Sequence, residues 1–158
     1  MIDICHKRHI IGNMKESRVV LDTNVFVAAG RSRQGAAFAL LKALREGRFR
    51  IMASVPLFLE YEAVLKRPEQ LMVGRRSEAM VDAFLDALSL RTESVHLHFL
   101  WRPQLRDPAD EMVLETALNG RADALVTFNV SDFAPAGRFG FPVWTPREFL
   151  LKLEEEND

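Results

Sequence analysis

The chain has 158 residues, of which 48% are hydrophobic and 27% charged, and its formal net charge is −1. This length suits one domain with a single core, and the composition excludes an intrinsically disordered chain. The small net charge excludes a strong overall attraction to nucleic acid, so any such binding must use a local patch. The single cysteine, Cys5, excludes an internal disulfide and a cysteine-rich metal site, which is typical of proteins of the reducing cytoplasm.

The two ends of the chain differ in pattern from its middle. Residues 1–16 show neither helical nor strand periodicity and are predicted to form a flexible N-terminal extension, with Met14 as a second candidate start. Charged and histidine residues interrupt this segment, so it lacks the apolar core of a secretory signal. No apolar run approaches the ~18 residues that span a bilayer, so we expect no membrane contact. Residues 17–153 are predicted to form one domain, followed by an acidic tail at 154–158.

Short apolar runs and helical patterns alternate along the domain. The runs predict strands at 18–22, 49–54, 123–128 and 141–145. They are apolar almost throughout, as expected for strands that are covered on both faces. Helices are predicted at 34–46, 55–67, 77–88, 108–119 and 146–154, with a helix–helix connection at 67–76. This alternation predicts an α/β fold with a mostly parallel sheet wrapped by helices.

Polar residues stand where three of the predicted strands end. Asp22 ends the first strand, Ser54 the second, and Asn129 follows the third. Ligands bind outside the carboxyl ends of the strands in open α/β sheets, so these side chains would share one functional edge. A surface turn is the simpler explanation for Asp22 by itself.

A carboxylate on the helix at 55–67 has unusual surroundings. Glu60 has four apolar neighbours at helical spacing, namely Pro56, Leu57, Ala63 and Val64. We therefore expect its side chain to face the interior, where an unpaired charge is costly. Glu62 lies four residues before Lys66 and is expected to form an exposed pair.

The segments around the third strand add further acids. Asp107 is predicted to cap the helix at 108–119, with Asp110 in its first turn. Both acids could simply complement the helix N-terminus, although Glu111 already supplies charge there. Asp132 follows Asn129 in the loop after the third strand and would be an ordinary loop acid if it stood alone.

The four acids have a shared use if the fold brings them together. Clustered carboxylates raise one another's pKa values, so such a cluster persists only with a compensating cation. Oxygen ligands favour hard divalent ions, here Mg²⁺ or Mn²⁺. Such an ion can activate water and stabilise charge on a phosphodiester. The candidate ligands are Asp22, Glu60, Asp110 and Asp132.

The order of these motifs resembles the PIN domain family, which includes the VapC-type toxins of bacterial toxin–antitoxin pairs. The resemblance covers about residues 18–150. "VVLDTNVFVAA" resembles the first acidic motif, and "ASVPLFLEYEAVLKRPE" the second, in which a serine precedes the acid by six residues. "RDPADEMVLETAL" is similar to the third motif and "ALVTFNVSDF" to the fourth. Each motif alone is weak, whereas four in this order are a fairly specific combination.

The resemblance implies a three-layer α/β/α fold and metal-dependent hydrolysis of RNA phosphodiester bonds. It implies catalytic and metal-binding roles for the four acids above, an antitoxin protein as partner, and a homodimer. Asn129 occupies a position where many members have aspartate, and Asp132 would then complete the site. The supporting residues would be Thr23, Asn24, Ser54, Asp107, Thr127 and Asn129.

Two alternatives stay open at this stage. The chain could be a catalytically weakened PIN-like module that binds RNA or protein, which the asparagine at 129 would explain. A phosphoacceptor that uses Asp22 as nucleophile is a third hypothesis, but Asn24 stands where that chemistry needs a second acid.

A basic segment offers a surface for phosphate backbones. Residues 31–50 carry six arginines and lysines and one acid, Glu46. Arg31 and Arg33, in the loop expected after the first strand, are predicted to meet RNA, whereas Lys42 and Arg45 could equally form a solvated helix face.

Overall fold

A computed structural model describes residues 16–99 and 104–158 of the chain, so all but the last residue of the extension predicted at 1–16 lies outside the described residues. Five strands form the sheet: β1 (Arg18–Leu21), β2 (Arg50–Ala53), β3 (Thr92–Ser94), β4 (Ala124–Val126) and β5 (Val143–Trp144). The α-helices are α2 (Thr23–Arg31), α3 (Ala36–Arg45), α4 (Val55–Leu65), α5 (Pro68–Gly74), α6 (Glu78–Ser89), α7 (Pro108–Gly120) and α8 (Pro146–Asn157). A 3-10 helix, η1 (Val130–Phe139), follows β4.

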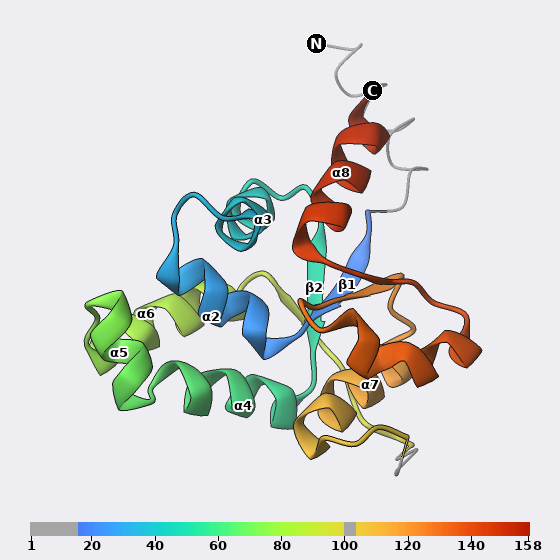
Figure 1. Cartoon of the computed structure of the whole chain (residues 1–158), viewed down its shortest axis with the longest axis horizontal. Helices are drawn as coiled ribbons and strands as arrows, with labels where there is room; N and C mark the ends of the chain where they lie inside the picture. The colour runs from blue at the N-terminus through green and yellow to red at the C-terminus, as the bar shows by residue number, and fades with distance from the viewer. Residues whose placement is uncertain (1–15, 100–103) are drawn as a thin grey trace.

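The sheet is parallel throughout, with strand order β3-β2-β1-β4-β5. Right-handed crossovers therefore place α2 to α6 on one face of the sheet, and α7 with η1 on the other. Figure 1 shows α2, α5 and α6 on one side of β1 and β2, and α7 on the opposite side. The three-layer α/β/α fold expected from the sequence is confirmed. No helix within the described ranges is long and apolar enough to cross a membrane.

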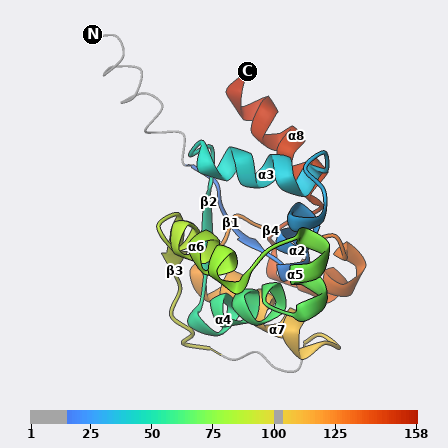
Figure 2. The same cartoon turned by 90° about the vertical axis from the view of Figure 1, so that its left-hand side faces the viewer.

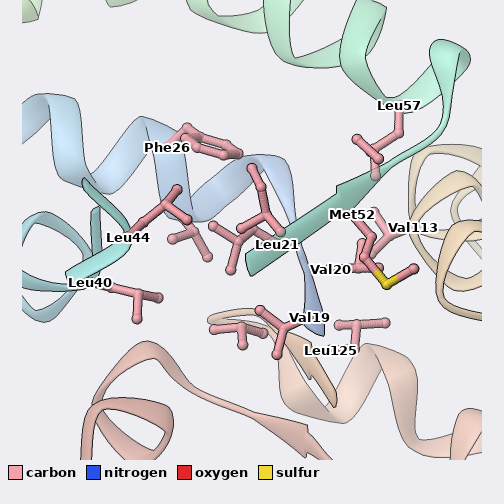
Figure 3. Packing of buried hydrophobic residues seen from close by; sticks show 14 of the residues in the cluster. Val19, Val20, Leu21, Phe26, Leu40, Leu44, Met52, Leu57, Val113 and Leu125 are labelled. Atoms are coloured by element: carbon pink, nitrogen blue, oxygen red, sulfur yellow. The ribbon is translucent and has the colours of Figure 1, made fainter. Parts of the chain in front are cut away.

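Both faces of the central strand are buried, as its continuous apolar sequence predicts. Val19, Val20 and Leu21 of β1 are fully enclosed. Figure 3 shows Leu21 on the side of Phe26, from α2, whereas Val20 lies toward Val113, from α7. Successive strand residues point to opposite faces, so β1 joins the two helical layers in one core. The residue that follows, Asp22, is thereby held at the centre of the sheet.

Four elements were not predicted from the sequence, namely α2, α5, β3 and η1. Helix α2 follows Asp22 immediately, where a loop was expected, and α5 occupies the expected helix–helix connection. Strand β3 is short and polar at the sheet edge, so it carries no apolar run. In Figure 2, α5 lies in front of α2 and beside α4, covering the same helical layer. Helix α8 continues to Asn157, beyond the predicted helix end at 154.

Candidate active site

Asp22 lies where β1 turns directly into α2. Its backbone N–H donates to the Val126 carbonyl of β4 at 2.9 Å, which fixes the residue between neighbouring segments. Its side chain is only 8% exposed. Burial raises the pKa of Asp22, and the nearby backbone N–H groups of Thr23 and Asn24 act in the opposite direction. Asp22 is thus a nearly enclosed carboxyl group at the carboxyl edge of the sheet.

The hydroxyl of Thr127 organises the surroundings of Asp22. This fully buried side chain, just after β4, donates to Oδ2 of Asp22 at 2.8 Å. Its oxygen also accepts from the side-chain amide of Asn24 at 3.2 Å and from the backbone N–H of Asn129 at 3.0 Å. One hydroxyl therefore links the starts of α2 and η1 to the carboxylate. The supporting residues expected at 24, 127 and 129 lie together in this network.

Ser54 ties the second strand end to the opposite helical layer. Its hydroxyl accepts from the Leu57 N–H, which caps α4, and lies 2.8 Å from the Thr116 hydroxyl of α7. Both side chains are buried. The sequence predicted Ser54 as a supporting residue and missed Thr116. Thr116 stands among apolar residues on α7, and such a polar position is the signal that could have revealed it.

Tyr61 is a second contact that sequence reasoning missed. Its side chain is fully buried, and its hydroxyl donates to the Leu21 carbonyl, one residue before Asp22. The ring packs against Phe26 with ring centroids 4.6 Å apart. Tyr61 therefore fixes the end of β1 against α4. Its spacing from Leu57 and Leu65 on one helix stripe was the available signal.

The N-terminus of α7 carries two acids of different function. Asp107 is exposed and caps the helix, accepting from the Ala109 N–H at 2.9 Å. Asp110 is half-buried one turn further on. The pKa of Asp110 is raised to about 6, first by burial and then by neighbouring negative charges. The acids that act on it are Asp22, Asp107, Asp132 and Glu111.

Asp132 reaches this group from the first turn of η1, where it is exposed. Its backbone N–H donates to the Asn129 carbonyl at 3.0 Å, which closes the turn after β4. Its charge raises the pKa of Asp110, so the two carboxylates lie within electrostatic range. The structure therefore gathers acids from three distant segments at one edge. We call Asp22, Asp107, Asp110 and Asp132 the acidic cluster.

Glu60 stands outside this electrostatic group. It is half-buried on α4, and its carboxylate makes no hydrogen bond or ion pair within the part of the chain that the structure describes. Its charge is not among those that raise the pKa of Asp22 or Asp110. Two of its four apolar neighbours, Pro56 and Ala63, are exposed, so the enclosed surroundings expected for Glu60 are wrong. The expected exposed pair of Glu62 with Lys66 is present at 3.6 Å.

The acidic cluster matches a hard divalent cation in the type of its ligands. Across residues 16–99 and 104–158, no three Asp, Glu, His or Cys side chains form a ready-made cage for an ion. However, every charge that shifts the pKa of Asp110 is negative, so a cation would relieve the repulsion. Carboxylate oxygens are the donors that Mg²⁺ and Mn²⁺ prefer. The residues thus fit such an ion in chemistry, without being preformed around it.

Arg31 and Arg33 occupy a different place from the one expected. Arg31 is the last residue of α2 and Arg33 follows it, so a nine-residue helix separates them from Asp22. Such a helix is about 13 Å long. The Arg31 side chain donates to the side chain of Gln70, in α5, at 3.4 Å. The expectation that both arginines belong to a loop directly after the first strand is wrong.

Glu111 is a further acid near the site whose burial the sequence did not reveal. It is 4% exposed, and its Oε1 accepts from the backbone N–H groups of Gln104 and Leu105, both at 2.6 Å. Its Oε2 is buried without a hydrogen-bond partner among the described residues. The Glu111 carboxylate therefore holds the backbone of the segment before Asp107 against the start of α7.

A parallel sheet with acids gathered beyond its carboxyl edge is typical of open α/β proteins, the class in which ligands bind at that edge. The model of the PIN domain family matches residues 18–131, and the chain belongs to this family. The family resemblance inferred from the four motifs is confirmed.

The fold is also similar to that of a chain in the crystal structure of VapBC2 from Rickettsia felis bound to a DNA fragment from their promoter. The TM-score is 0.54 with 18% sequence identity, over 81% of this chain and 98% of that chain. At this identity the likeness concerns the fold. No curated protein matches the chain.

Proposed function

We propose that this chain is a metal-dependent endoribonuclease and the toxin of a bacterial toxin–antitoxin pair. The observation that carries the proposal is the acidic cluster, in which carboxyl groups from three segments come so close that burial, together with the neighbouring negative charges, raises the pKa of Asp110 to about 6. Membership of the PIN domain family supports nuclease chemistry at this cluster. The likeness to a VapBC2 chain supports an antitoxin as partner. A homodimer is part of the same proposal.

Asp22, Asp110 and Asp132 would hold Mg²⁺ or Mn²⁺, with Asp107 adding negative charge beside them. When bound, the ion supplies water activation and stabilises charge on the phosphodiester. Thr127 holds Oδ2 of Asp22, which leaves the other carboxylate oxygen free of that hydrogen bond. Ser54 holds the end of β2 against α7, and Tyr61 holds the end of β1 against α4. Glu60 remains a predicted ligand on the strength of its motif.

The decisive experiment compares Asp22→Asn with a matched control, Asp86→Asn. Asp86 is an exposed acid on α6, outside the cluster. Purified proteins are incubated with labelled RNA and Mg²⁺ or Mn²⁺, and cleavage is followed by gel. We expect the parent and Asp86→Asn to cleave and Asp22→Asn to lose activity while keeping its circular dichroism spectrum. Equal cleavage by Asp22→Asn and the parent would contradict the assignment.

A binding module without catalysis is the second candidate. It is favoured by the absence of a ready-made metal cage among the described residues and by the amide of Asn129 at the fourth motif. Titration of Mn²⁺, followed by calorimetry, separates the two functions. A nuclease should bind the ion saturably and lose affinity in Glu60→Gln and Asp110→Asn. A binding module should show no saturable binding.

A further inference from the structure

An aromatic ring is exposed at the same edge as the acidic cluster. Phe128 directly follows the buried Thr127, yet its side chain is 45% exposed. It makes no ring contact with the other described residues. Most of the other large exposed apolar side chains among the described residues, such as Leu90 and Met72, belong to helices or their ends instead. Phe128 is therefore an uncovered apolar surface beside the buried Asp22.

The backbone on both sides of Phe128 is fixed by the groups that hold Asp22. The Phe128 N–H donates to Oδ1 of Asn24 at 3.4 Å, and the Asn24 amide donates to the Thr127 hydroxyl. The N–H of the next residue, Asn129, donates to that same hydroxyl. The backbone that carries the ring is thus tied to the network around Asp22. Rigid attachment distinguishes this aromatic from one on a free loop.

Carboxylates and a metal ion contact the phosphate of a nucleic acid but offer no surface to its bases. Single-stranded RNA exposes unstacked bases, and proteins bind these by stacking them on aromatic side chains. We propose that Phe128 is a stacking platform for a nucleobase next to the phosphate that meets the acidic cluster. This inference rests on the proposed nuclease function, because it concerns the same site. It makes Phe128 a substrate-binding residue that tolerates any base.

The test uses Asp22→Asn protein, which prevents cleavage, with Mg²⁺ present. The probes are fluorescent ten-residue oligonucleotides of adenosine, of uridine and of abasic ribose phosphate, and binding is followed by anisotropy. Phe128→Ala removes the ring, and Phe128→Trp restores an aromatic surface. Leu90→Ala is the matched control, since Leu90 is 87% exposed at the end of α6, just before β3 begins. Cleavage by proteins with Asp22 intact is measured in parallel.

Stacking predicts that affinity falls in the order adenosine, uridine, abasic backbone. We expect Phe128→Ala to weaken adenosine binding at least about fivefold and to abolish the difference between the three probes. Phe128→Trp should restore that difference, and Leu90→Ala should leave it unchanged.

Three results would overturn the inference: equal adenosine binding with and without Phe128, an equal loss on the abasic backbone, or no saturable binding of any probe. The first of these would leave the ring as a surface for a protein partner. If the parent cleaves RNA while Phe128→Ala binds normally, the nuclease proposal survives and the stacking platform does not. If the probes show stacking on Phe128 but no protein cleaves RNA, the stacking platform survives and the nuclease proposal does not.

Discussion

The Thr127 hydroxyl donates a 2.8 Å hydrogen bond to the Asp22 carboxylate, although 105 residues separate them in the sequence. The bond lies between the ends of β1 and β4, and both side chains are buried. It therefore couples the orientation of Asp22 to the pairing of these strands. Any ion at Asp22 would depend on this contact.

Replacing Thr127 by valine should impair the site more than it changes the packing. Valine keeps the shape but removes a hydroxyl that serves Asp22, Asn24 and the Asn129 N–H. We expect a loss of stability of about 1–3 kcal/mol and metal affinity reduced about 10–100-fold. Urea denaturation and Mn²⁺ calorimetry measure the two effects. Thr127→Ser, which keeps the hydroxyl, should recover most of the affinity, and failure to do so would contradict this role.

The raised pKa of Asp110 makes the metal-free protein less stable as pH rises. Between its ordinary value of 3.8 and about 6, the folded state binds more protons at Asp110 than the unfolded state. The stabilisation that protonated Asp110 contributes is fully present below this pH range and is lost as the pH rises through it. Asp110→Asn should remove the loss and raise the melting temperature at pH 8 by about 2–4 °C, on the order of 1 kcal/mol after solvent screening.

Thermal melts in EDTA from pH 4.5 to 8 provide the measurement. Asp22 has a raised pKa of the same sign, so a smaller slope should remain in Asp110→Asn. The exposed control Asp86→Asn should reproduce the slope of the parent. Identical slopes for the parent and Asp110→Asn would show that Asp110 titrates normally.

Metal binding should release a proton near pH 6. The carboxylate of Asp110 must be ionised to coordinate an ion, and its pKa is about 6 in the folded chain. We expect the affinity for Mn²⁺ to increase steeply between pH 5 and 7 and to level above that range. Calorimetry in buffers of different ionisation enthalpy counts the released protons. A pH-independent affinity over this range would exclude Asp110 as a ligand.

Tyr61→Phe isolates the contact between α4 and the end of β1. The substitution keeps the ring against Phe26 but leaves the Leu21 carbonyl without its buried donor. We expect destabilisation of about 1–3 kcal/mol and a lower melting temperature. Phe58→Leu, in the neighbouring ring contact, is the packing control. Only Tyr61→Phe should also weaken Mn²⁺ binding, because only it alters the residue before Asp22.

Two substitutions of Glu111 separate its role as a hydrogen-bond acceptor from its role as a negative charge. Glu111→Gln keeps an oxygen for the N–H groups of Gln104 and Leu105, whereas Glu111→Ala leaves both without it. Urea denaturation should show a loss of about 1–3 kcal/mol for alanine and a much smaller one for glutamine. Equal losses would mean that the charge of Glu111, rather than its contacts with the preceding segment, supports α7.

The sequence predicted the parts of the fold that depend on local apolar pattern. The strands β1, β2 and β4 were found because their apolar runs are buried on both faces, and β5 because its short run is apolar although it is only partly buried. Helix α2 was missed, since "TNVFVAAGR" continues the apolar run of β1 with no Gly or Pro to mark the start of a new element. The polar β3 is defined by pairing with β2, which a local reading does not contain.

The residues of the candidate site also divide into those that the local sequence pattern identified and those that it did not. Asp22 and Asp132 follow strands and Asp110 begins a helix, so element ends sufficed to nominate them. Tyr61 and Thr116 act through contacts with distant segments, and no spacing rule pairs them in advance. For Glu60 the helical spacing predicted too much rather than too little. It identified four apolar neighbours but could not show that two of them would stay exposed.

The strand order has a consequence for how this site can change. The chain leaves β1 toward one helical layer and leaves β4 toward the other, so the carboxyl ends of these neighbouring strands form a topological switch point of the sheet. Residues 128–142 follow β4 at this point and contribute no strand to the sheet. Changes in this segment beyond Asp132 would therefore reshape the border of the proposed site without moving Asp22 or Asp110, which other elements hold.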